Sequence, residues 1–243
     1  MQVSLLITCL VDTFFPQVGI ATVRLLRRMG VEVEFTAAQT CCGQPAFNAG
    51  FPDEARGIAC RMIEALEPAE AVVCPSGSCV AMVKLFYPEL FRDDPRWHGR
   101  AASLAAKTYE LSEFIVTVLG RDDVGARLKA RVTYHDGCHM LRGLGIADAP
   151  RRLLRAVRDL ELVELETPTC CGFGGTFAVD YSEISSSMLE DKLAAVCATG
   201  AEYVVSSDSS CLMQIGGGLT RAGSAIRTLH LAELIVRGIE HAG

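Results

Sequence analysis

The motif Thr-Cys-Cys-Gly occurs twice in the sequence, at residues 40–43 and 169–172, an offset of 129 residues. Cys9 and Cys138 are separated by the same offset. A segment ending in Cys79 resembles one ending in Cys211 at an offset of 132. A series of matches in the same order at similar long offsets indicates an internal duplication. The chain is therefore expected to fold as two similar halves.

A further repeat locates the end of each half. Residues 108–115 resemble residues 228–235, at an offset of 120. Between the halves, around residues 120–130, glycine and an Arg-Asp-Asp run interrupt the apolar periodicity, as is typical of a linker. We therefore expect one domain at residues 1–122 and a second at residues 123–243.

Each half has the pattern of strand, helix, strand, Cys-Cys-Gly turn, helix, strand and helix. The ranges expected in the first half are 3–8, 18–29, 31–35, 53–66 and 71–73; those in the second are 132–135, 151–157, 160–165, 182–199 and 203–205. Gly30 is expected to end the first helix and Asp53 to cap the next. Alternating strands and helices predict an α/β fold, with a small parallel sheet flanked by helices in each half.

Composition limits the classes of function. Of the 243 residues 50% are hydrophobic and 21% charged, which is typical of a folded globular protein. The formal net charge of −6 argues against a nucleic-acid partner. Residues 3–10 are apolar but lack the features of a signal peptide, and no segment approaches the roughly 20 apolar residues of a transmembrane helix. A cytoplasmic protein is expected.

Eleven cysteines are many for that compartment, where disulfides are rare and clustered cysteines usually bind metals or perform redox chemistry. Sites in parallel sheets form beyond the carboxyl ends of strands, where several of these cysteines fall. The repeats define two candidate ligand sets: Cys9, Cys41, Cys42, Cys74 and Cys79 in the first half, and Cys138, Cys170, Cys171 and Cys211 in the second. Cys60 and Cys197 fall within helices without counterparts and are interpreted as core or spare thiols.

Thiolates select zinc, copper(I) or iron–sulfur clusters. A zinc ion is normally held by spaced cysteines, whereas adjacent cysteines more readily reach different metal atoms. This argument favours iron–sulfur centres over zinc. The neighbouring glycines, Gly43 and Gly172, allow a sharp turn beside a bulky cofactor.

The motifs resemble those of the CCG, or cysteine-rich, domain family, which includes the B component of heterodisulfide reductase and iron–sulfur subunits of glycolate and glycerol-3-phosphate dehydrogenases. The matching segments are residues 135–139, 170–177 and 208–217. The resemblance implies an iron–sulfur electron-transfer subunit that helps to oxidise L-lactate, or a related 2-hydroxy acid, to the keto acid (pyruvate from lactate) together with other iron–sulfur subunits. It also implies [4Fe–4S] clusters, with a noncubane form in the five-cysteine half. The chain departs from that pattern in the spacing of Cys74 and Cys79, and in Ser206, which replaces the counterpart of Cys74.

Other residues near the motifs are candidates for function. His135, His139 and Asp208 are candidate catalytic residues as metal ligands, hydrogen-bond donors or proton carriers. Asp136 is expected to pair with Arg142. The glycine-rich residues 172–175 do not match a nucleotide-binding motif, and residues 216–218 are expected to end a helix.

Two functions remain as alternatives to an electron-transfer subunit. Heterodisulfide reductase, the relative named above, suggests a thiol or disulfide reductase that acts alone. Structural zinc ions would instead make the chain a zinc-stabilised scaffold. Zinc found after purification in air would not support this alternative, because thiolates that have lost a cluster scavenge zinc.

Overall fold

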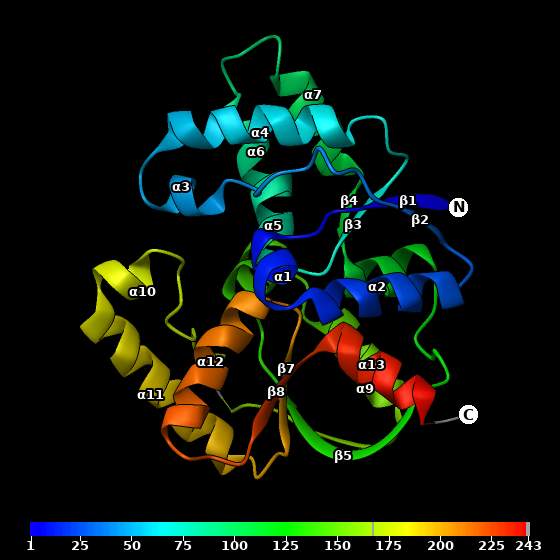
Figure 1. The fold of residues 1–243 in the computed structure, drawn as a ribbon, viewed down its shortest axis with the longest axis vertical. Helices are drawn as coiled ribbons and strands as arrows, with labels where there is room; N and C mark the ends of the chain where they lie inside the picture. Colours follow the sequence, from blue (N-terminus) through cyan, green and yellow to red (C-terminus); the bar gives the residue numbers. More distant parts are fainter. Residues whose placement is uncertain (167, 242–243) are drawn as a thin grey trace.

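The computed structural model describes residues 1–166 and 168–241 and contains two four-stranded parallel sheets (Figure 1). The strand order is β2-β1-β3-β4 in one sheet and β6-β5-β7-β8 in the other. The strands of the first sheet are β1 (Gln2–Leu5), β2 (Glu32–Glu34), β3 (Val72–Cys74) and β4 (Thr108–Glu110). Those of the second are β5 (Arg127–Tyr134), β6 (Arg158–Val163), β7 (Tyr203–Ser206) and β8 (Arg227–His230). The predicted α/β fold with two similar halves is confirmed.

Helices and short π-helical turns (η) connect the strands. Those of the first half are α1 (Cys9–Phe14), α2 (Pro16–Arg28), α3 (Gln44–Asn48), α4 (Pro52–Leu66), α5 (Gly77–Ala81), η1 (Met82–Phe86), α6 (Tyr87–Leu90), α7 (His98–Ala106), α8 (Leu111–Glu113) and η2 (Phe114–Val118). Those of the second are η3 (His139–Gly143), α9 (Asp148–Ala156), α10 (Phe177–Asp180), α11 (Ser182–Ala198), α12 (Ser209–Arg221) and α13 (Leu231–Glu240). No helix in these described ranges is long and apolar enough to cross a membrane.

Several local predictions were wrong. The edge strands β4 and β8 were not expected, because each is only three or four residues long and leads directly into a helix. Asp53 does not cap α4; Pro52 occupies the first turn, and the residue before it, Phe51, makes no side-chain cap. Strand β5 begins at Arg127, inside the stretch expected to be a linker. The boundary between residues 122 and 123 stays a prediction.

The glycines at 216–218 also differ from expectation, because they lie inside α12 and do not end it. A side chain at Gly218 would approach Leu193 Cδ1 to 2.8 Å, so this glycine lets α12 pack closely on α11. Gly30, in contrast, follows α2 with a φ of +80° and ends the helix as predicted.

The two halves pack through pairs of equivalent elements. Helix α2 packs on α13, and its counterpart α9 packs on α8 and η2. Likewise α1 contacts α12, while α5 contacts η3. One hydrophobic core includes buried residues of both halves, such as Val73 and Val205. The halves are therefore related by an approximate twofold axis, and the carboxyl ends of both sheets lie near their interface (Figure 1).

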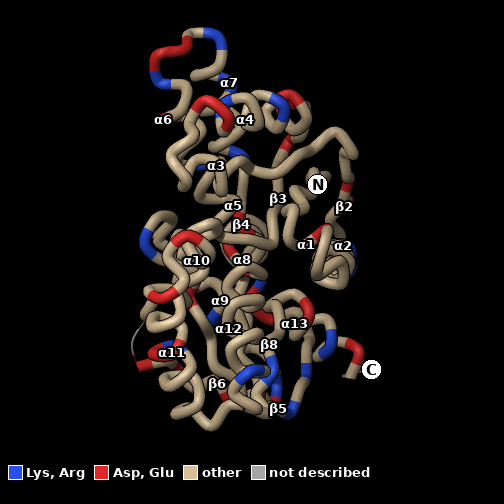
Figure 2. Tube along the Cα trace, turned by 60° about the vertical axis from the view of Figure 1, so that its left-hand side comes forward, with Lys and Arg blue, Asp and Glu red and all other residues tan. Residues whose placement is uncertain are grey.

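Figure 2 shows that acidic and basic residues are interspersed over both halves in this view, with no basic face.

Candidate functional site

A cavity of about 410 Å³ lies where the two halves meet and is lined by cysteines of both. The first half contributes Cys9, Cys41, Cys42 and Cys79, and the second contributes Cys138, Cys170, Cys171 and Cys211. The fold thus brings eight of the nine candidate thiols to one shared cavity. Cys60 lies in α4 and Cys197 is exposed on α11, and neither lines it.

The cysteine pairs lie in loops that turn sharply at the following glycine. Gly43 and Gly172 have φ angles of +84° and +81°, which other residues rarely adopt. In each loop the glycine N–H donates to the sulfur of the first cysteine of the pair, at 3.4 Å from Cys41 Sγ and from Cys170 Sγ. The prediction of a glycine turn at each pair is confirmed.

The thiols of each set contact one another. In the first half Cys9 Sγ lies 3.7 Å from Cys41 Sγ, and Cys42 Sγ lies 3.4 Å from Cys79 Sγ. Hydrogen bonds from Cys42 and Cys9 lower the pKa of Cys41, and those from Cys138 and Cys171 lower the pKa of Cys170 in the same way. In each set, the first thiol to lose its proton is therefore the one whose sulfur also accepts the glycine N–H. Such preformed thiolates are the form in which cysteine binds metals.

Cys74 is the exception among the candidate ligands. It is the last residue of β3 and is completely buried, but it does not line the cavity. Burial raises the pKa of its thiol, and the neighbouring Cys79 raises it further. Its counterpart Ser206 is also buried and accepts a hydrogen bond from the backbone N–H of Asp208.

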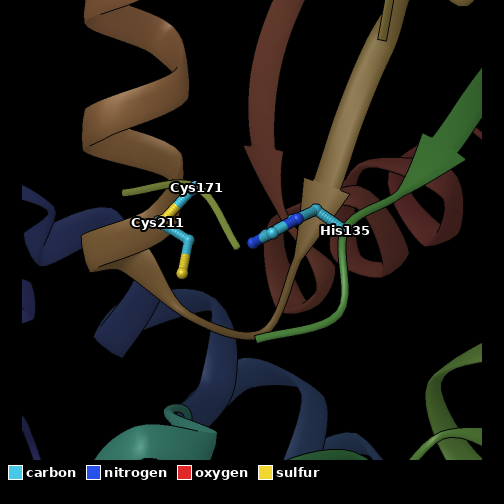
Figure 3. Close-up of side chains that lie close together, drawn as sticks. All are labelled: His135, Cys171 and Cys211. Carbon is cyan, nitrogen blue, oxygen red and sulfur yellow. The ribbon is translucent and has the colours of Figure 1, made fainter. Parts of the chain in front are cut away.

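The two candidate histidines lie in different surroundings. His139 lines the cavity, and its ring meets that of Phe86 edge-on. His135 is 1% exposed, and one of its ring nitrogens lies with the sulfurs of Cys171 and Cys211 in a group whose members are all within 4.8 Å of one another (Figure 3).

Asp208 lies in the cavity wall and is buried. It precedes α12 but makes no side-chain cap to that helix. Its Oδ1 instead accepts hydrogen bonds from Ser76 Oγ at 2.8 Å, from Ser78 Oγ at 2.9 Å and from the Ser78 N–H at 3.1 Å. The carboxylate therefore joins the two halves beside the cavity.

The expected pair between Asp136 and Arg142 is wrong. Asp136 instead forms a two-pronged ion pair with Arg151 of α9, with distances of 2.8 and 2.7 Å. The Arg151 guanidinium also stacks over the Tyr134 ring. This pair fixes the chain next to His135, and it could not be found from local spacing.

Three buried polar residues near the interface were missed. Lys192 is completely buried on α11, and its Nζ has no hydrogen-bond partner in the part of the chain that the structure describes. The sequence carried a signal for it, because helical spacing places Lys192 on the same face as Leu189 and Val196. The other two, Glu110 and His230, are equivalent in the repeat, and each caps the helix that follows its edge strand.

The fold and site together define an α/β protein of two similar halves with a cysteine-lined cavity between them. The family model described as "CCG: Cysteine-rich domain" matches residues 3–84 and 132–216, one match in each half. The chain belongs to this CCG cysteine-rich domain family.

Close relatives share nearly the whole chain. The lactate utilization protein A of Macrococcus caseolyticus is 51% identical over 99% of this chain and 98% of its own. That of Bacillus licheniformis is 52% identical over 97% of this chain and 99% of its own. Among solved structures, a hypothetical protein from Helicobacter pylori superposes with a TM-score of 0.62 at 10% identity, covering 98% of this chain and 49% of that one. This likeness shows the fold alone.

Proposed function

We propose that the chain is an iron–sulfur electron-transfer subunit of a lactate utilization system. It receives electrons released when L-lactate is oxidised to pyruvate, and it passes them to other iron–sulfur subunits. The observation that carries this proposal is the pair of four-thiol sets that face one cavity from equivalent positions. The name of the relatives supports the choice of lactate.

The residues present fit iron–sulfur clusters. Such clusters are held by cysteine thiolates, commonly four for a [4Fe–4S] cluster. We assign Cys9, Cys41, Cys42 and Cys79, with Cys74 beneath them, to one centre, which the five-cysteine pattern makes the candidate for a noncubane form. We assign Cys138, Cys170, Cys171 and Cys211 to the other. The buried ammonium of Lys192 near the second set fits a group that carries negative charge.

When bound, the clusters supply one-electron transfer between donor and acceptor. The chain orients the sulfurs by its two glycine turns, and it donates backbone N–H groups to Cys41 and Cys170. Hydrogen bonds to cluster sulfurs are one of the means by which proteins set reduction potentials. The cavity keeps the two sets facing each other, so that electrons have a short path between the halves.

The same proposal places the chain in the cytoplasm with partner iron–sulfur subunits and without nucleic acid. None of the eleven cysteines forms a disulfide in the structure, in keeping with a compartment where disulfides are rare.

Anaerobic reconstitution tests the cofactor. Purified protein supplied with iron and sulfide should turn brown, bind both elements and lose visible absorption on reduction. Cys41→Ser and Cys170→Ser should each lose iron, whereas Cys60→Ser, which removes a thiol outside the cavity, should not. Zinc without iron in anaerobically purified protein would support the zinc-stabilised scaffold instead.

The role in lactate oxidation needs a separate test. The reconstituted chain alone should not be reduced by L-lactate, but it should be reduced when the partner subunits captured with it under anaerobic conditions are added. Reduction by lactate without partners, or none with them, would contradict the proposed role.

The shared cavity favours a second candidate function, a disulfide reductase that acts alone. A cavity of about 410 Å³ reached by both sulfur sets has room for a small molecule. Reduction of small disulfides by the reconstituted chain and an artificial donor would establish this activity.

A further inference from the structure

The second half lacks one thiol that the first half has. Cys74 ends β3, and Ser206 takes the equivalent place at the end of β7. The residue that follows the neighbouring strand, β1 in the first sheet and β5 in the second, changes as well. Leu6 donates its N–H to Val73 at 2.9 Å, and His135 donates its N–H to Val205 at 2.8 Å, so these two residues are equivalent. The pair Leu6 and Cys74 of the first half thus becomes His135 and Ser206 in the second.

The side chain able to bind a metal therefore changes place between the halves: it is Cys74 at the end of β3 in the first half, and His135 after β5 in the second. In the first half the thiol ends β3, and the residue that follows the neighbouring strand β1 is an inert leucine. In the second half the residue that follows β5 carries an imidazole, and the residue that ends the neighbouring strand β7 carries a hydroxyl. Imidazole is a good ligand for iron and zinc, whereas a serine hydroxyl is a poor one. Where Ser206 lacks the thiol, a side chain able to bind a metal stands beside it.

The surroundings of His135 lack the hydrogen bonds that a buried imidazole normally has. It is 1% exposed, and neither Nδ1 nor Nε2 has an oxygen or nitrogen hydrogen-bond partner among residues 1–166 and 168–241; its polar neighbour is the thiol of Cys211. A buried polar atom without a partner costs roughly 1 to 3 kcal/mol, so two on one ring point to a missing partner. Figure 3 shows the ring directed toward the sulfurs of Cys171 and Cys211. One ring nitrogen lies within 4.8 Å of both.

We propose that His135 is a ligand of the metal centre in the second half, in the role that a thiol has in the first. This inference rests on the proposed function, because it assumes that the four second-half thiols hold an iron–sulfur centre. Replacement of thiolate by neutral imidazole makes an iron–sulfur centre less negative and raises its potential, as in Rieske centres. The second centre is therefore the easier one to reduce, and the two halves form an ordered pair of electron carriers.

Pulsed electron paramagnetic resonance of the reconstituted, reduced protein tests the ligand directly. Protein labelled with ¹⁵N-histidine should show a nitrogen coupling of the size of a direct iron–imidazole bond. His135→Leu should abolish this coupling, while His139→Gln, a change of the other histidine beside Cys138, should retain it. Loss in His139→Gln but not in His135→Leu would overturn the inference.

A rescue variant separates a lost ligand from a damaged fold. His135→Leu should lose the iron of the second centre, and His135→Leu combined with Ser206→Cys should regain it without the nitrogen coupling, because it recreates the pair found in the first half. A lowered midpoint potential in the double variant is the expected signature of a thiolate in place of an imidazole.

The outcomes distinguish the inference from the proposed function. Wild-type protein that binds no iron would overturn both. Iron-loaded wild-type protein whose spectrum and iron content are the same in His135→Leu would overturn the inference alone. A coupling of the weaker size expected for a hydrogen bond to sulfur would also overturn it, since it would make His135 a donor and not a ligand.

Discussion

Asp208 occupies in the second half the place that Ser76 occupies in the first, and its carboxylate accepts a hydrogen bond from that same Ser76 at 2.8 Å. Equivalent residues of two related halves can touch only near the axis that relates them. The contact therefore marks the approximate twofold axis at the cavity. Ser78 donates to the same Oδ1 through both its hydroxyl and its backbone N–H.

Asp208→Ala should destabilise the iron-free protein by about 2 to 4 kcal/mol, because it leaves one buried and two partly buried donors without their charged acceptor. Asp208→Asn keeps one oxygen at that place and should cost less. Urea denaturation of the two variants measures the difference. Equal losses would mean that the charge and the hydrogen bonds at this oxygen contribute little.

The edge strands make a second reciprocal contact between the halves. The Nδ1 of His230 accepts the N–H of Ala232, so its Nε2 is free to donate to the carbonyl of Pro75 in the other half at 3.1 Å. Its counterpart Glu110 faces Ser207, the residue equivalent to Pro75. Burial acts on the two in opposite directions. It lowers the pKa of His230 to about 4 and raises the pKa of Glu110 to about 7.

His230 should make the protein less stable in acid. An unfolded histidine titrates near 6.5. Between pH 6.5 and pH 4 the unfolded chain therefore binds a proton at this residue that the folded chain does not. The contribution of neutral His230 to the free energy of unfolding is complete above pH 6.5. It is lost as the pH falls toward 4, a total of about 3 kcal/mol. His230→Gln should remove this part of the pH dependence in urea denaturation of the iron-free protein.

Glu110 should act in the opposite sense. Its raised pKa means that the folded chain keeps a proton that the unfolded chain loses above about pH 4.3, so stability from this group falls as the pH rises toward 7. The two slopes offset each other in the wild type between about pH 4.5 and 6.5. Glu110→Gln should therefore make stability rise more steeply with pH over that range, and His230→Gln should make it fall. Variants with the same slope as the wild type would contradict both assignments.

The duplication, visible as repeated motifs, was enough to predict the parallel sheets and the cysteines that meet between them. Local patterns failed where distant residues decide the outcome. Nothing near Asp136 indicates Arg151 as its partner, and Gly216 and Gly218 are explained only by the close packing of α12. The strand β4 is set by pairing with β3, since three residues carry too little periodicity to be recognised. The sequence places the Lys192 cation on an apolar helix face, but it does not show why a charge lies there.

Gly172→Ala should damage the second site. A Cβ there would lie 2.6 Å from the carbonyl oxygen of Ser185, and the φ of +81° disfavours any side chain. The loop carrying Cys170 and Cys171 must then shift, so we expect the free energy of unfolding to fall by roughly 1 to 3 kcal/mol and bound iron to be lost.

Gly217→Ala is the matched control, because it lies in α12 and a Cβ added there would have nothing within 4 Å. It should be neutral or stabilise the protein by up to about 1 kcal/mol. Equal effects of the two substitutions on iron content would show that the turn at Gly172 is not needed.

Lys192→Met should lower the reduction potential of the second-half centre. The Lys192 side chain is completely buried, and its Nζ has no hydrogen-bond partner in the described ranges. Burial lowers its pKa, whereas the thiols of the second set, Cys171 foremost, raise it. A positive charge beside the centre favours the more negative, reduced state, so its removal should lower the midpoint potential by on the order of 50 to 100 mV. Redox titration of the reconstituted protein measures the shift.

Lys129→Met removes the same charge from an exposed site near the start of β5, away from the cysteines, and should leave the potential unchanged. Lys192→Arg keeps the charge and should retain most of the potential. A fall of the same size in Lys192→Met and Lys129→Met would mean that net charge, and not the buried ammonium, sets the potential.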